Sequence, residues 1–66
     1  MEITVNGQKQ DYVGPPLVAS LLESLGVNPR AVVVERNLRI VPRLDLENEP
    51  IRHGDYIEII RFVGGG

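Results

Sequence analysis

The sequence contains no cysteine and a single histidine, His53. Without cysteine the chain cannot form disulfides, thiolate metal sites or thiol nucleophiles, so any sulfur that it carries cannot sit on a thiol of its own. One histidine does not make a metal site, which needs three or four ligands, and we expect His53 to be a solvated turn residue. No pair of carboxylates is placed for acid–base catalysis, and the acidic residues between positions 45 and 55 lack the spacing of a calcium loop. We therefore expect no catalytic and no metal-binding residues.

Basic charge and long apolar runs are also scarce. The chain carries 7 basic and 9 acidic residues, a net charge of −2, which argues against nucleic acid as a partner. No apolar run approaches the roughly 20 residues of a membrane span, and no signal peptide opens the chain. These absences predict a cytoplasmic protein that binds neither nucleic acid nor a membrane.

The composition is otherwise that of a small globular domain. Of the 66 residues, 42% are hydrophobic and 24% are charged. A chain of this length buries only about 60% of its unfolded surface, so its expected stability is small. We predict one domain over residues 1–63, followed by a flexible glycine tail over residues 64–66.

The first part of the chain predicts a β-hairpin. Apolar and polar residues alternate from Met1 to Val5, which is typical of a strand. Asn6-Gly7 follows and favours a type I′ turn, in which both central residues need positive φ. Residues 9–13 form the expected returning strand, in which either Tyr12 or Val13 faces the core.

A helix is predicted over about residues 16–25. Gly14-Pro15-Pro16 ends the preceding strand, and the fixed φ of the second proline suits the first turn of a helix. Gly26 stands at the expected left-handed C-cap, with Val27 placed for the accompanying apolar contact. Apolar residues recur at i, i+3, i+4 and i+7 and form one stripe: Val18, Leu21, Leu22 and Leu25.

Two further strands are expected after the helix. The β-branched run over residues 31–36 predicts a central strand that is covered on at least one face. Asn37-Leu38 predicts a tight turn into a short strand over residues 39–42. Pro42 cannot donate a ladder hydrogen bond, so this short strand belongs at an edge of the sheet.

The next segment is expected to be turns. Residues 43–49 are mostly polar and predict a helical turn that Leu44 and Leu46 pin to the core. Residues 50–55 predict a turn in which Gly54 supplies positive φ.

Residues 56–63 predict the last and longest strand. Strand register places Ile57 and Ile59 on one face and Ile60 and Phe62 on the other. A helix covers only one face, so we expect Ile57 and Ile59 in the core and Ile60 and Phe62 partly exposed. The alternative is that Ile60 and Phe62 complete the core, since single exposed apolar residues are common.

The order of elements predicts the fold class. A hairpin followed by one helix and three more strands favours an α+β roll of the β-grasp kind. In this roll one mixed sheet carries a single main helix across one face.

The last three residues are Gly64, Gly65 and Gly66. Their only reactive group is the α-carboxylate of Gly66, which is ionised at neutral pH. A tail without Cβ atoms can enter a slot too narrow for other residues, which indicates a carboxyl terminus presented to another protein's active site. The alternative is a frayed chain end. We expect a docking surface just before the tail, formed by Ile60, Arg61, Phe62 and Val63.

Several motifs together resemble a known family. The most specific combination is Asn-x-x-Ile-Val-Pro-Arg at residues 37–43, followed by Gly54-Asp55 and by a strand that leads into terminal glycines. With the Asn6-Gly7 hairpin and the helix, it is similar to the ThiS family, the sulfur carriers of thiamine biosynthesis, over essentially the whole chain. One departure is Gly14-Pro15-Pro16, where relatives more often carry a polar helix cap; this bears on stability rather than function.

The resemblance implies a ubiquitin-like β-grasp fold and a carrier that is not itself an enzyme and binds no cofactor. A ThiF-type, ATP-dependent adenylyltransferase would join the Gly66 carboxylate to AMP. Sulfur from a donor such as a cysteine desulfurase would displace AMP and leave a thiocarboxylate on Gly66. A ThiG-type thiazole synthase would then take the sulfur into the thiazole ring.

Three other functions remain open from the sequence. The chain resembles the small subunit of molybdopterin synthase in fold and terminal glycines, although that group is usually longer. It could also be a ubiquitin-like modifier conjugated through Gly66 to lysines. The third alternative is a β-grasp interaction module whose tail is incidental.

Overall fold

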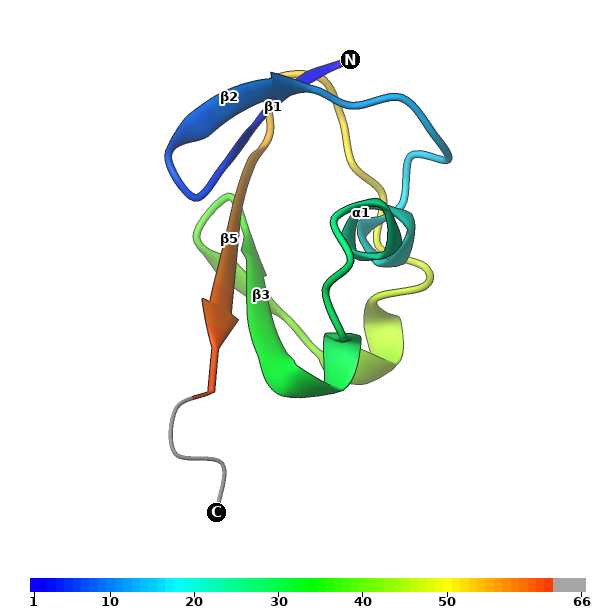
Figure 1. Ribbon diagram of the computed structural model, residues 1–66, viewed down its shortest axis with the longest axis vertical. Helices are drawn as coiled ribbons and strands as arrows, with labels where there is room; N and C mark the ends of the chain where they lie inside the picture. Colours follow the sequence, from blue (N-terminus) through cyan, green and yellow to red (C-terminus); the bar gives the residue numbers. More distant parts are fainter. Residues whose placement is uncertain (63–66) are drawn as a thin grey trace.

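The strand that leads to the glycine tail lies at the centre of the sheet (Figure 1). The computed structural model describes residues 1–62. Residues 63–66 lie outside the described residues, and with them the predicted boundary between the domain, which was expected to end at Val63, and the glycine tail at 64–66. Within residues 1–62 the sheet has five strands in the order β2-β1-β5-β3-β4: β1 Glu2–Val5, β2 Gln8–Asp11, β3 Val32–Arg36, β4 Arg39–Val41 and β5 Tyr56–Arg61.

The sheet is mixed, as predicted. β1 runs parallel to β5, whereas the pairs β1–β2, β3–β4 and β3–β5 are antiparallel. The helix α1, Val18–Ser24, packs across one face, and the short 3₁₀ helices η1, Pro29–Ala31, and η2, Arg43–Asp45, lie in the connections. This arrangement confirms the predicted α+β roll of the β-grasp kind.

The turn of the first hairpin forms where the sequence places it, whereas the returning strand covers Gln8–Asp11 rather than residues 9–13. Asn6 and Gly7 have φ values of 48° and 81°, the positive values that a type I′ turn requires. Tyr12 is buried and Val13 is exposed, which resolves the open choice between them. The Tyr12 hydroxyl donates to the Pro15 carbonyl at 2.7 Å, so its polar end is satisfied within the core.

The helix is shorter than predicted. It begins at Val18 rather than at residue 16, because Leu17 has an extended backbone with φ −131° and ψ 144°. Pro16 therefore precedes the helix, and its prediction as a first-turn residue is wrong.

Main-chain groups from a distant segment take the place of the missing polar cap. No side chain caps the start of α1. Instead, the amides of Val18 and Ala19 donate to the carbonyls of Glu49 and Leu46, each at 3.0 Å. These bonds satisfy two of the amides that a helix start leaves free.

The end of the helix matches the prediction. Gly26 has φ +70° and its amide donates to the Glu23 carbonyl, while the Val27 amide donates to the Leu22 carbonyl at 2.9 Å. This pair of bonds is a Schellman motif. Of the predicted apolar stripe, Val18, Leu21 and Leu22 are buried, but Leu25 is 39% exposed because it already belongs to the turn.

The second half of the chain corrects one more prediction. Asn37 and Leu38 form the turn with φ 51° and 70°, and β4 lies at the edge of the sheet and ends before Pro42. In the segment 43–49 only Leu46 is buried, whereas Leu44 points into solvent and pins nothing. Gly54 has φ +87°, as expected for its turn.

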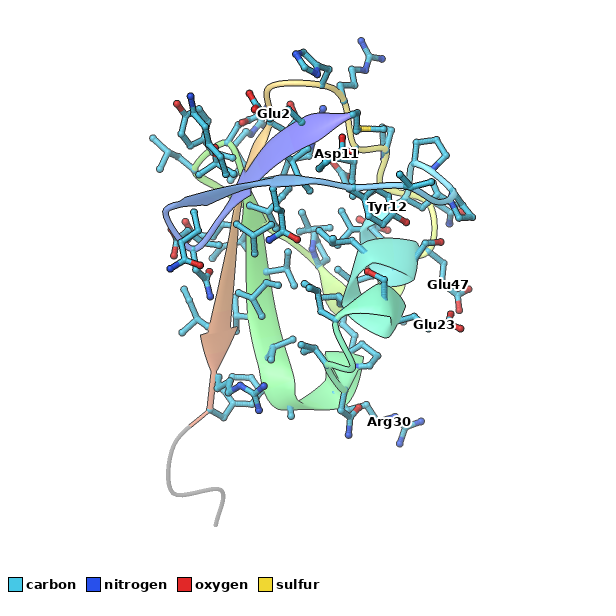
Figure 2. All side chains as sticks on the ribbon, turned by 45° about the horizontal axis from the view of Figure 1, so that its top comes forward. Glu2, Asp11, Tyr12, Glu23, Arg30 and Glu47 are labelled. Carbon is cyan, nitrogen blue, oxygen red and sulfur yellow. The ribbon has the colours of Figure 1, made fainter. Side chains whose placement is uncertain are left out.

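The core lies between the sheet and α1 (Figure 2). Ile57 is 1% exposed and Ile59 is partly buried against the core, as predicted. Figure 2 shows Tyr12 closing the core between β2 and α1, with Glu23 and Glu47 on the outside. No helix in residues 1–62 is long and apolar enough to cross a membrane.

Candidate docking surface and carboxyl-terminal strand

The face of the sheet opposite α1 carries an apolar patch at the end of β5. Ile60 and Val33 are directly opposite each other in the β3–β5 register. Four side chains share this face, and we call them the outer patch: Val33, Ile40, Ile60 and Phe62. Ile60 is 47% exposed and Phe62 is 60% exposed, so the alternative that these two complete the core is excluded.

A shallow groove of about 410 Å³ runs beside the outer patch. Val33, Ile40 and Phe62 contribute to its lining, together with the basic residues Arg30 and Arg43. Figure 2 shows Arg30 pointing away from the body near the end of the molecule where β5 finishes. The groove therefore combines apolar surface with positive charge next to the last described residue.

Two carboxylates lie on the same face as the outer patch. Glu35 and Glu58 are opposite each other in the β3–β5 register. Like charges directly opposite across a ladder destabilise a sheet, so the fold alone gives no reason for this pair. Together with the exposed Ile60 and Phe62 they make a mixed apolar and acidic surface, which suits contact with a partner protein.

The start of β5 is held by a charged cluster that the sequence analysis missed. The Arg36 side chain donates to Asp55 at 2.7 Å and to Glu49 at 3.1 Å. Asp55 also accepts from the Asn37 side chain at 3.1 Å and from the Arg52 amide at 2.8 Å. The sequence predicts Gly54-Asp55 as part of a turn and of the family motif, but no local pattern connects Asp55 to Arg36 and Asn37, which lie 19 and 18 positions away.

The cluster shifts the pKa values of its two strongest partners. Burial alone would raise the pKa of Asp55, but the hydrogen bonds from Asn37, Arg36 and the Arg52 amide, with the guanidinium charge, outweigh it and lower that pKa. The hydrogen bond to Asp55 raises the pKa of Arg36 further above its ordinary value, against the opposing effect of desolvation. Both groups therefore stay charged and anchor the turn that leads into β5.

The predicted site residues fall into two groups. Ile60, Arg61 and Phe62 lie together at the end of β5 and are exposed, as a docking role requires. Val63 and the glycines Gly64, Gly65 and Gly66 lie outside the described residues. His53 lies on the surface, where its Nδ1 accepts from the Glu2 amide at 3.1 Å.

The sequence model of the ThiS family matches residues 3–66. The chain belongs to the ThiS family. A crystal structure of the thiamine biosynthesis protein ThiS from Geobacter metallireducens has a TM-score of 0.85 at 33% identity, and the match covers 100% of both chains. The two proteins therefore share one fold over the whole of the match.

Two kinds of curated relative match the chain. The sulfur carrier protein ThiS of Thermus thermophilus is 30% identical over 64 residues, which is 97% of this chain and 98% of the relative. A thiazole synthase of Paramagnetospirillum magneticum is 41% identical over 66 residues, which is all of this chain but 20% of the relative. The chain thus spans a fifth of the length of the thiazole synthases that it matches.

Proposed function

We propose that this protein carries sulfur for thiazole formation in thiamine biosynthesis, as a thiocarboxylate on Gly66. A ThiF-type adenylyltransferase uses ATP to join the Gly66 carboxylate to AMP and releases pyrophosphate. The persulfide of a donor such as a cysteine desulfurase attacks the acyl adenylate and displaces AMP, and a thiol then reduces the resulting acyl disulfide to leave the thiocarboxylate. A ThiG-type thiazole synthase accepts the sulfur. The protein is a co-substrate of these enzymes and catalyses none of the steps. We place this cycle in the cytoplasm.

One structural observation carries this proposal. The end of the central strand carries exposed apolar residues, Ile60 in the strand and Phe62 just after it, and in the sequence only Val63 separates Phe62 from the glycines. A domain that only needed to fold would gain nothing from large apolar side chains there. A domain that presents its carboxyl terminus to an enzyme needs contact surface at that point.

The free energy of docking accounts for the presence of a folded body. Ordering the three glycines in an enzyme channel costs about 1–2 kcal/mol each, or roughly 3–6 kcal/mol together. Fully burying an exposed Ile or Phe side chain gains about 1.5–3 kcal/mol, so completing the burial of the exposed members of the outer patch, Ile40, Ile60 and Phe62, gains roughly 1 kcal/mol each. The outer patch therefore offsets most of the ordering cost, and main-chain hydrogen bonds to the tail supply the rest.

The thiamine pathway is favoured over molybdopterin synthesis by the relatives. Sequence matches include two proteins named thiazole synthase and one named sulfur carrier protein ThiS. Each of these thiazole synthases contains a segment that is similar to this whole chain. The simplest explanation is that a carrier of this kind and a thiazole synthase take part in the same reaction.

A reconstituted reaction tests the pathway. The chain is first incubated with ATP, a ThiF-type adenylyltransferase, a cysteine desulfurase and ³⁵S-labelled cysteine. The loaded protein is then divided between two reactions, one with a ThiG-type thiazole synthase and one with a molybdopterin synthase large subunit, each with its acceptor substrate. We expect label in the thiazole product alone. Label in molybdopterin alone would reassign the carrier, and label retained in higher-mass protein conjugates would indicate a modifier.

A further inference from the structure

A side chain in the first hairpin turn pairs with the main chain of β5. Asn6 follows the last residue of β1, and its amide donates to the Ile57 carbonyl at 2.9 Å. Its Oδ1 accepts from the Ile59 amide at 2.7 Å, and its Nδ2 donates to the Ile59 carbonyl at 3.3 Å. The Asn6 carboxamide thus makes the two hydrogen bonds to Ile59 that the main chain of β1 would make if that strand continued.

Asn6 marks the end of the support for β5 on this side. On the β3 side, the Asn37 amide donates to Tyr56 and the Phe62 amide donates to Ala31, so even-numbered residues of β5 bond to β3. Because ladder bonds alternate, the main-chain groups of Ile59 and Arg61 face β1. β1 pairs with β5 only at Thr4↔Tyr56 and Val5↔Ile57. Among residues 1–62, the Asn6 side chain is therefore the last group of the first hairpin that pairs with β5.

The turn itself does not require asparagine. Asn6 has φ +48°, which glycine adopts without strain and aspartate also tolerates. The carboxamide offers a donor and an acceptor on two separate atoms to the two main-chain groups of Ile59, as a peptide unit would, whereas aspartate keeps only the acceptor and glycine offers neither. The residue type at position 6 is thus explained by the contact with β5 and only in part by the turn.

We propose that Asn6 is a positioning residue for the carboxyl-terminal segment. By holding Ile59 at both main-chain groups, it fixes the direction in which the chain continues through Ile60 and Phe62 toward the adenylating enzyme. It also ends the ladder there, which leaves the N–H and C=O of Arg61 facing an open edge where an extended segment of that enzyme can pair. This inference rests on the proposed function, because it assigns Asn6 a part in presenting Gly66.

The second hairpin provides a matched control. Asn37 occupies the same turn position with φ +51°, and its side chain accepts from the Tyr56 amide at 2.9 Å and donates to Asp55 at 3.1 Å. It therefore makes a comparable pair of hydrogen bonds at the opposite end of the same strand. Substitution of Asn37 costs structural hydrogen bonds without touching the end of β5 that precedes the tail.

The test compares Asn6→Gly with Asn37→Gly, two substitutions that keep the positive φ and delete the side-chain contacts. Adenylation by a ThiF-type enzyme is followed as ATP–pyrophosphate exchange, and amide hydrogen exchange is measured at Ile59 and Tyr56. We expect Asn6→Gly to lower kcat/KM by on the order of tenfold and Asn37→Gly to leave it within about twofold. Asn6→Asp keeps the acceptor for the Ile59 amide and is expected to restore part of the rate.

The outcomes separate this inference from the proposed function. Faster exchange of the Ile59 amide in Asn6→Gly with unchanged kcat/KM would overturn the positioning role and leave the carrier function intact. Equal losses in Asn6→Gly and Asn37→Gly, in proportion to their losses of stability, would reduce Asn6 to a structural residue. Absence of exchange activity with the unsubstituted chain would overturn the carrier function and this inference with it.

Discussion

Arg36 at the end of β3 and Asp55 before β5 are joined by a hydrogen-bonded ion pair of 2.7 Å. The Asp55 residue is only 7% exposed, and a second contact of 3.1 Å ties the same guanidinium to Glu49. These contacts connect three segments that are not neighbours in sequence. They fix the start of the central strand, while Asn6 holds it nearer its end.

The Arg36–Asp55 pair predicts a loss of stability in acid. The pKa of Asp55 is lowered in the folded protein, so the folded state holds this proton less readily than the unfolded state. Its contribution is present above the ordinary value of 3.8 and is lost as the pH falls from there through the lowered value. Denaturant unfolding at a series of pH values down to 2 should show the free energy of unfolding falling in this window.

Asp55→Asn provides the control for this pH dependence. The substitution removes the carboxylate charge and should lower the free energy of unfolding at neutral pH by about 1.5–3 kcal/mol, the range for hydrogen bonds to charged groups. The variant should lose less further stability in acid than the unsubstituted protein does. Parallel pH curves for the two proteins would show that Asp55 does not cause the acid sensitivity.

The Asn37-Leu38 turn predicts a stabilising substitution. Leu38 has φ +70° and is 88% exposed, so its side chain gains little by packing and its backbone is strained. Leu38→Gly should raise the free energy of unfolding by about 0.5–1 kcal/mol, because relief of the left-handed strain exceeds the entropy that glycine adds to the unfolded chain. Thermal unfolding followed by circular dichroism measures the change.

The first hairpin supplies the reverse experiment. Gly7 occupies the equivalent position with φ +81°, and no atom lies within 4 Å of a Cβ built there. Gly7→Leu should therefore lower the stability through the backbone alone, by about 1 kcal/mol. If Leu38→Gly destabilised the protein, the strain assigned to Leu38 would be wrong, and a contact of its side chain would have to account for the difference.

The outer patch predicts weaker docking without loss of the fold. Ile60→Asp and Phe62→Asp place charge on the exposed face next to the tail and should weaken binding to a ThiF-type enzyme by at least about tenfold each. Leu44→Asp is the matched control, since Leu44 is 91% exposed and lies in η2, away from β5. Calorimetric titration gives the affinities, and melting temperatures should stay close to that of the unsubstituted protein. Equal affinity for all three variants would place the docking surface elsewhere.

Local signals in the sequence predicted most of the elements. The Asn6-Gly7 and Asn37-Leu38 turns and the Gly26 C-cap depend on positive φ, which few residues adopt readily, so the residue types themselves indicate the conformation. Alternation along β5 correctly separated the buried Ile57 from the exposed Ile60. These features are set by neighbours in sequence.

The errors and omissions involve contacts between distant segments. The start of α1 was misplaced because its amides bond to the carbonyls of Leu46 and Glu49, which no local motif reveals. The ion pair of Arg36 with Asp55 and the contact of Asn6 with Ile59 are likewise separated by 19 and 53 positions. Leu44 was mistaken for a core residue because two leucines two positions apart do not show which of them faces inward.

Intact-mass spectrometry shows whether the Gly66 carboxylate carries the sulfur. The chain is incubated with ATP, a ThiF-type adenylyltransferase and a sulfur donor, next to a variant that lacks Gly66. We expect a mass gain equal to the exchange of one oxygen for one sulfur, located on Gly66 by fragmentation. The variant should show no such gain and an unchanged circular dichroism spectrum. No adenylate and no thiocarboxylate with a competent enzyme, or sulfur on another residue, would contradict it.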